Sequence, residues 1–289
     1  MTHPWQSISV IVASILCVAT MGPLNAQTLN FASTDNKQPI EINAEQGIEW
    51  KRDELVFLAR GNAHAIRGDV NVYADTLKAY YREKSKTTKG KGTEIWRLDA
   101  DGNVRIVSPG QKAFGDKGVF DVDKSILILT GVKKKVHFIT AQDKITADNQ
   151  IEYWEAKQMA VARGNAVARR ENRVLRADVL AAYFRKDRSG KSKVYRIEAF
   201  DNVRVKTAEE RAIADRGVYV VATGIAVLTG NVRMFRGQDQ LKGCKAEINL
   251  NTGISKLFSC PASSPGGGRV QGVLQSSRKK KSPAAGKKK

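Results

Sequence analysis

Short stretches in which apolar and polar residues alternate occur throughout the middle of the chain. Residues 70–72 (Val-Asn-Val), 104–106 (Val-Arg-Ile) and 203–205 (Val-Arg-Val) are examples. A period of two places successive side chains on opposite faces of an extended strand, and β-branched residues favour that conformation. No long window has the periodicity of an amphipathic helix. The pattern therefore predicts an all-β protein of short antiparallel strands, with one apolar face and one face rich in Arg and Lys.

An internal repeat organises these strands. Residues 59–63 (Ala-Arg-Gly-Asn-Ala) recur at 162–166, an offset of 103, and residues 103–105 recur at 202–204, an offset of 99. The difference in offset falls between Tyr81 and Ile95, where a stretch rich in Lys, Gly and Thr predicts a loop. Fixed-period similarity of this kind is typical of stacked architectures. The repeats span about 39–140 and 141–260, and the sequence leaves open one continuous stack or two domains.

Two kinds of marker recur within each repeat. Seven pairs consist of a small residue followed by an acid, and between them fall Gly-Asn or close variants. A small residue followed by an acid is typical of a tight turn, where Asp bonds its own backbone. We therefore expect the acidic pairs in turns, and about seven two-strand units that must stack to enclose a core. The seven pairs are Ala44-Glu45, Ala74-Asp75, Gly115-Asp116, Ala147-Asp148, Ala177-Asp178, Ala214-Asp215 and Ala246-Glu247.

The N-terminal residues have a different composition. Residues 1–26 contain no Lys, Arg, Asp or Glu, and an apolar run from Ile8 to Met21 precedes a small residue, Ala26. This pattern predicts a secretory signal peptide, followed by an N-terminal segment at 27–38. An uncleaved membrane anchor is the alternative.

The C-terminal residues are basic. Residues 261–289 contain eight Lys or Arg, no acidic residue and no apolar periodicity. Such a segment buries too little apolar surface to offset the entropy of ordering, so we expect a disordered Lys-rich tail. The tail is either a solvated end or an electrostatic tether to an anionic membrane surface or nucleic acid.

Cys244 and Cys260 are the two cysteines outside the signal segment. Residues 251–253 (Asn-Thr-Gly) predict a hairpin turn with Gly available for a positive φ. In a hairpin centred on Thr252, both cysteines lie eight residues from the centre (252 − 244 = 260 − 252) and face each other. An oxidising compartment then favours a disulfide between them. Two free thiols are the alternative.

Composition adds a constraint on partners. The 49 Lys and Arg against 29 Asp and Glu leave a net charge of +20, of which 20 − 8 = +12 lies before residue 261. A basic surface implies an anionic partner. His64 and His137 correspond in the repeat to Val167 and Arg236, and neither lies in a nucleophile or metal motif. The recurring acids favour turn chemistry over a catalytic pair. We therefore expect no enzymatic activity, metal or cofactor.

Three consecutive motifs carry a resemblance. Residues 38–45 (Gln-Pro-Ile-Glu-Ile-Asn-Ala-Glu), 57–63 and 70–75 resemble the OstA-like family, and the likeness recurs at 164–183 and 228–234. The resemblance implies an elongated, twisted β-jelly roll of stacked antiparallel strands with an apolar inner groove. It implies a non-enzymatic periplasmic protein that shields the acyl chains of lipopolysaccharide (lipid A).

The implied role is to bridge inner and outer membranes during lipopolysaccharide export and outer-membrane assembly. Its implied partners are an LptC-like inner-membrane protein, an LptD-like outer-membrane protein and further copies of itself, end to end. The chain departs from the family pattern in its larger number of units and its Lys-rich tail.

Strand parity, started from the matching family positions Ile40 and Ile42, assigns the groove. The alternative for each residue is an ordinary β-sandwich core. Arg105, Arg204 and Arg233 take equivalent outward positions, where we expect them to be solvated or to contact anionic head groups. The expected groove residues are Ile40, Ile42, Leu55, Phe57, Val70, Val72, Val104, Ile106, Leu175, Val203, Val205, Val232 and Met234.

Other functions stay open. A membrane-anchored LptC-like subunit would retain residues 8–21 as an anchor. A basic β-repeat protein that binds acidic polysaccharide or nucleic acid would show steep salt dependence and no apolar groove. A repeat enzyme acting on polysaccharide would need a carboxylate cluster that the sequence lacks. The leading interpretation expects no nucleic-acid partner.

Overall fold

The computed structural model describes residues 39–83, 92–188, 192–262 and 268–275. These residues form eighteen antiparallel strands in one continuous hydrogen-bonded sheet, and none of them is helical. The predicted all-β class is confirmed. The strands are β1 (Glu41–Asn43), β2 (Ile48–Lys51), β3 (Val56–Arg67), β4 (Val70–Glu83), β5 (Thr93–Ser108), β6 (Gln111–Asp121), β7 (Ile126–Thr130), β8 (Val136–Thr140), β9 (Asp143–Ala147), β10 (Gln150–Trp154), β11 (Met159–Arg170), β12 (Arg173–Lys186), β13 (Ser192–Lys206), β14 (Glu210–Val220), β15 (Ile225–Arg236), β16 (Asp239–Asn249), β17 (Ile254–Phe258) and β18 (Gln271–Val273).

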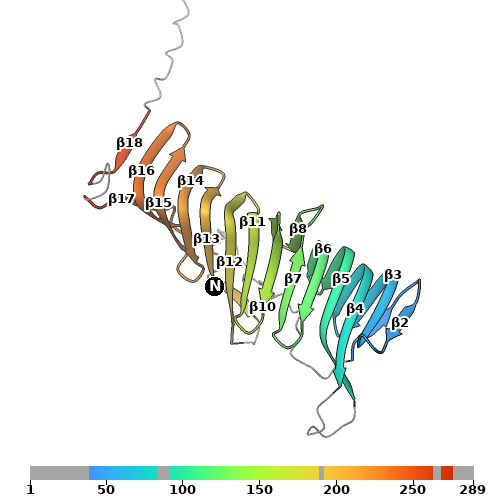
Figure 1. Ribbon diagram of the computed structural model, residues 1–289. Helices are drawn as coiled ribbons and strands as arrows, with labels where there is room; N and C mark the ends of the chain where they lie inside the picture. Colours follow the sequence, from blue (N-terminus) through green and yellow to red (C-terminus); the bar gives the residue numbers. More distant parts are fainter. Residues whose placement is uncertain (1–38, 84–91, 189–191, 263–267, 276–289) are drawn as a thin grey trace, which may run out of the picture.

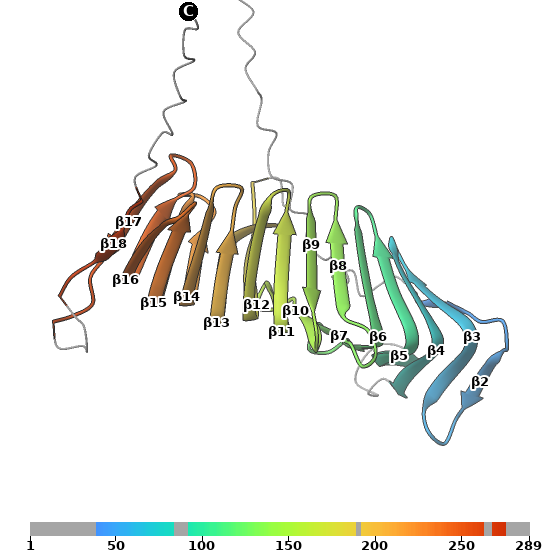
Figure 2. The same cartoon turned by 90° about the horizontal axis from the view of Figure 1, so that it is seen from above.

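The strands form two layers that face each other along an elongated molecule (Figures 1 and 2). Long strands such as β3–β6 and β11–β16 contribute to both layers. The first layer also contains β1, β8, β9 and β18, and the second also contains β2, β7, β10 and β17. Pairing continues through β6–β8–β9–β11 in the first layer and β6–β7–β10–β11 in the second. The two sequence repeats therefore form one continuous stack.

The Gly-Asn pairs mark a corner where each long strand passes from one layer to the other. The strand register shifts at these positions, because two residues on one strand stand opposite a single acidic residue on its neighbour. At one corner Gly102 and Asn103 have φ of 79° and 47°. The Asn103 side-chain amide donates a hydrogen bond of 3.0 Å to the Asp75 carboxylate. A β-bulge of this kind bends a strand, and here it is repeated along the stack.

The acids therefore have a different role from the one expected. We expected the small-acidic pairs in turns, and Glu45 and Asp148 do lie in bends between strands, but Asp75, Asp178 and Asp215 lie inside the long strands β4, β12 and β14. Each carboxylate accepts a hydrogen bond from an asparagine of the adjacent strand in place of its own backbone. The same pairing joins Asn62 to Glu45, Asn165 to Asp148, Asn202 to Asp178 and Asn231 to Asp215 at 2.7–2.8 Å.

The central corner is built differently. Asp116 Oδ2 accepts hydrogen bonds from the backbone amides of Lys134 (2.9 Å), Val132 (2.6 Å) and Lys133 (2.5 Å). These three amides hold the pKa of Asp116 at about 2. Charge-assisted hydrogen bonds to several backbone donors stabilise the ionised carboxylate strongly. Here the acid supports an extended corner, residues 131–135, that separates β7 from β8.

A disulfide joins Cys244 and Cys260, with Cα atoms 4.9 Å apart. This is the pair expected from the sequence, but the hairpin register differs by one residue. Asn249 pairs with Ile254, so the hairpin centre lies between residues 251 and 252 rather than on Thr252. Cys260 lies two residues beyond the end of β17, where the backbone no longer pairs with β16 and the side chain can reach Cys244.

The expectation that residues 261–289 lie outside the fold is wrong at one place. Residues 271–273 form β18, which pairs with residues 240–242 of β16. The reason is that β17 covers only the second-layer half of β16, so the backbone groups of the first-layer half accept another strand. The signal peptide predicted at 1–26, the segment 27–38 and the Lys-rich residues 276–289 lie outside the described residues.

The corner packing can be tested with two glycines of similar conformation. Gly230 (φ 76°) faces Asp215, whose Oδ2 would lie 2.3 Å from an added Cβ. Gly237 (φ 58°) has open space around the same position. We expect Gly237→Ala to lower the free energy of unfolding by about 1–2 kcal/mol through backbone strain alone. Gly230→Ala should lower the free energy of unfolding by about 1–3 kcal/mol more than Gly237→Ala does, because the corner must also move to accommodate the added Cβ. Urea denaturation measures both, and equal losses would refute the proposed corner packing.

The disulfide makes a second stability prediction. Replacing both cysteines, as Cys244→Ser with Cys260→Ser, should lower the free energy of unfolding by about 3 kcal/mol, as expected for a loop of 16 residues. The loss should appear first as faster amide hydrogen exchange in β17, with slower exchange retained in β15. A uniform acceleration over the whole stack would contradict a local role.

Candidate functional site

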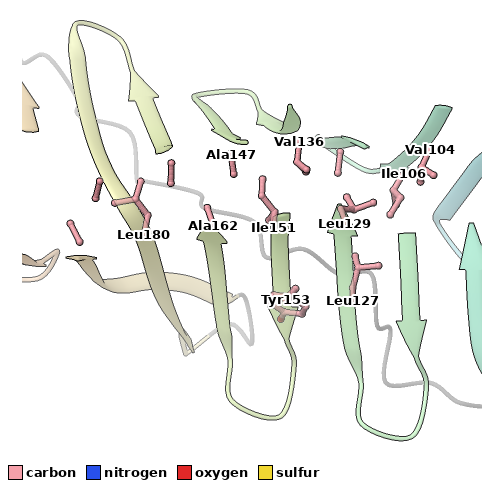
Figure 3. Packing of buried hydrophobic residues seen from close by; sticks show 14 of the residues in the cluster. Val104, Ile106, Leu127, Leu129, Val136, Ala147, Ile151, Tyr153, Ala162 and Leu180 are labelled. Carbon is pink, nitrogen blue, oxygen red and sulfur yellow. The ribbon is translucent and has the colours of Figure 1, made fainter. Parts of the chain in front are cut away.

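The inner faces of the two layers meet at a row of small residues along the corner. Cross-strand pairs in this row include Ala63 with Ala74, Val136 with Ala147, and Ala166 with Ala177. Five of these six side chains are at most 3% exposed, and Ala74 is 5% exposed. Small side chains allow the layers to approach closely at the corner. Larger apolar side chains from both layers point toward one another in the space between the layers (Figure 3).

An apolar groove opens between the layers in the N-terminal half. Its empty volume is about 740 Å³, part of which is open to solvent. Its lining contains side chains of both layers, and Arg67 is also part of the lining. Asp99 belongs to the lining as well, but its carboxylate is held 2.6 Å from Arg97. The apolar lining includes Ile40, Ile42, Val70, Val72, Val104 and Ile106 of the first layer and Leu77, Leu98, Phe120 and Leu127 of the second.

Most of the residues expected from strand parity lie together on the inner faces. The six first-layer residues named above were all expected, whereas Ala65 and Ile66, which also line the groove, were not. The expected residues of the C-terminal half pack in the same continuous apolar cluster: Leu175, Val203, Val205, Val232 and Met234. Whether any of them contacts a ligand stays a prediction.

Leu55 and Phe57 are exceptions. Leu55 is 43% exposed and has a φ of 51°, in the turn between β2 and β3. Strand parity does not apply across a turn residue, so its inward assignment is wrong. Phe57 lies outside the groove lining, in an aromatic group with Trp50 and Tyr81 at ring-centroid distances of 5.3 and 5.0 Å. The Trp50 indole donates a hydrogen bond of 2.8 Å to the Tyr81 hydroxyl, which fixes this group.

Sequence reasoning missed the second-layer half of the groove. On β4, Val72 and Ala74 face inward, and after Asp75 the inward parity changes to Leu77. The same change occurs on β6 after Asp116, which brings Phe120 to the inner face. The Gly-Asn pairs in the sequence mark β-bulges, and a bulge is where the inward-facing parity changes, so these pairs could have predicted the second-layer residues.

Titratable groups near the inner faces are few. Burial, the largest cause, raises the pKa of the Tyr153 hydroxyl to about 12, and its ring contacts Phe184 at 6.2 Å between centroids. His64 bonds to Asn71 at 2.9 Å and stacks on Tyr73 on the outer face. Among the described residues no group of three or more His, Cys, Asp or Glu side chains is placed to hold a metal ion.

The three arginines assigned to head groups lie on the outer face of the first layer. Arg105, Arg204 and Arg233 are exposed, and each neighbours inward-facing residues in its strand. They point away from the groove because alternate residues of a strand face opposite ways. Their position therefore does not support contact with a head group at the groove. Arg105 lies over the Tyr73 ring at 4.0 Å.

A sequence relative and a solved structure align with this chain. An uncharacterized protein of Rhizobium meliloti (strain 1021) is 21% identical over 127 residues, covering 44% of this chain and 68% of that protein. A crystal structure of LptH, the LptA-homologous periplasmic component of the lipopolysaccharide transport device of Pseudomonas aeruginosa, aligns with 12% identity and a TM-score of 0.22. That alignment covers 84% of this chain and 99% of LptH.

Within the described residues, no helix is long and apolar enough to cross a membrane.

The family model described as LptA/(LptD N-terminal domain) LPS transport protein matches the chain twice, at residues 41–150 and 144–254. This match confirms the resemblance to the OstA-like family and, within it, to LptA. Because the two matches together cover most of the chain, the protein belongs to the LptA/LptD N-terminal family of lipopolysaccharide transport proteins.

Proposed function

We propose that this protein is periplasmic and binds lipopolysaccharide by enclosing its acyl chains in the groove between the layers. The observation that carries the proposal is the apolar lining of this groove, from Ile40 and Val72 on one side to Leu98 and Leu127 on the other.

The physical chemistry suits transport. Each buried CH₂ group contributes roughly 0.8 kcal/mol, so several acyl chains bind without any covalent step. The attraction is non-directional, and the apolar cluster continues from Ile42 to Leu257 along the stack. The apolar surroundings of the groove therefore continue into the C-terminal half, where the inward residues are packed as core. This continuity supports export of the lipid across the periplasm.

Both ends of the stack carry exposed apolar residues on edge strands. Trp50 on β2 is 53% exposed at the N-terminal end, and Ile254 on β17 is 59% exposed at the other. Edge strands offer unpaired backbone groups to another chain. We propose that these ends join copies of the protein end to end. The same ends would contact an LptC-like protein at the inner membrane and an LptD-like protein at the outer membrane.

Photo-crosslinking in cells tests the groove. A benzophenone residue placed at Val72, which lines the groove, should form adducts with lipopolysaccharide. The same residue at Asn71 faces outward and serves as the matched control, because the backbone position is nearly identical. Adducts should be at least tenfold more abundant at position 72. Equal labelling at both positions, or none at either, would count against the groove.

Sedimentation tests end-to-end association. The wild-type chain should show a sedimentation coefficient that rises with concentration, and Phe258→Lys on the edge strand β17 should weaken the association at least tenfold. Val132→Lys is the control, because Val132 is exposed in the central corner, away from both ends. A Phe258→Lys protein that assembles like the wild type would exclude β17 from the interface.

A further inference from the structure

The outer face of the first layer carries a narrow band of positive charge over β11–β16. One row across these strands contains Arg176, Arg204, Arg233 and Lys242. The next row contains Arg169, Lys206 and Arg211. All seven side chains are exposed, and we call them the basic band. Asp178 and Asp215 have the same outward parity at the corner, where they bond Asn202 and Asn231, and the outward positions beyond the corner on β11–β16 contain no Asp or Glu.

The band differs from the outer face of the second layer on the same strands. There Arg163 lies 2.6 Å from Glu152, Lys245 lies 2.6 Å from Glu247, and Arg196 pairs with Glu198. No residue of the basic band forms an ion pair with a described residue, whereas neighbours on the other face have carboxylate partners. On these strands, the basic band therefore differs from the second-layer face in having no ion pairs with described carboxylates.

Within the basic band, positively charged residues stand directly opposite each other on neighbouring strands. Arg176 is the cross-strand partner of Arg204, and Arg233 is the partner of Lys242. Like charges placed opposite each other destabilise a sheet. A face that keeps such pairs free of carboxylates indicates an anionic ligand that neutralises them when it binds.

The shape of the band selects among anionic ligands. It is two rows wide on strands about 4.8 Å apart, and Ile213 of β14 interrupts the first row and Val174 of β12 the second. Each strand is rotated by roughly 20° relative to its neighbour, so the band winds along the stack. A flat membrane surface touches only part of a winding band, whereas a flexible linear polyanion can follow all of it.

We propose that the basic band binds a linear acidic polysaccharide bearing carboxylate or phosphate groups. The site is separate from the groove and does not depend on its ligand. Single-stranded nucleic acid fits less well, because base stacking needs free aromatic faces and the Phe235 ring in the band is covered by Arg211 at 5.4 Å.

The described part of the C-terminal sequence extends the first layer at this end. β18 pairs with β16 in the first layer, with Gln271 opposite Lys242. The chain continues from β18 into residues 276–289, which contain seven Lys or Arg and no acid. The described strand β18 therefore lies beside Lys242 of the basic band.

Fluorescence anisotropy with labelled polygalacturonate tests the proposal on the full chain. We expect Arg176→Gln, Arg204→Gln and Arg233→Gln together to weaken binding at least tenfold at moderate salt. The slope of log affinity against log salt should fall by about two, because three contacts each release roughly 0.7 of a counterion. The control combines Lys78→Gln, Arg216→Gln and Lys256→Gln, which removes the same charge from exposed positions on the other outer face. It should bind within twofold of the wild type.

Further outcomes decide the matter. Equal losses in both triple variants would show that net charge alone is responsible and would overturn the proposal. So would loss of all binding on deletion of residues 276–289, or tighter binding to single-stranded DNA or anionic vesicles than to polygalacturonate at the same salt. Thermal unfolding checks the fold. The band variant should unfold at or above the wild-type temperature, because the Arg176–Arg204 opposition is removed.

Discussion

The bend in each long strand is the constraint on which the rest of this structure depends. A flat sheet of this many strands would expose both faces, and its apolar residues would have nothing to pack against. A β-bulge, in which two residues of one strand stand opposite one residue of its neighbour, bends the strand so that it contributes to both layers. These bulges occur at Gly61, Gly102, Gly164 and Gly230. The asparagine-to-carboxylate bond holds each bend in place. The positive φ of Asn103 carries a cost that this bond offsets.

The corner determines the width of the interior. Small residues such as Ala63 and Ala166 meet at the bend, and larger ones such as Leu98 and Leu127 lie in the space between the layers. In the N-terminal half, the space between the layers away from the corner is the groove. The groove is therefore a consequence of the fold and needs no separate binding element.

Local alternation was sufficient to predict the strands, most of the first-layer lining and the cysteine pair, because each depends on neighbours in one strand or hairpin. Leu77 and Phe120 were missed because the inward parity changes at Asp75 and Asp116, and that change requires knowing which residue stands opposite. Leu55 was misassigned because a turn residue follows no strand parity. β18 was missed because three residues contain too little pattern to identify a strand whose position depends on the free edge of β16.

The disulfide makes the two ends of the stack unequal. Cys244 and Cys260 fasten the last hairpin, while the opposite end finishes in β1 and β2, of three and four residues, with no cysteine among the described residues nearby. In a stack where each unit contacts only its neighbours, opening spreads inward from the weaker end. The molecule therefore has a direction: its N-terminal end can fray and re-form while the other end keeps its shape.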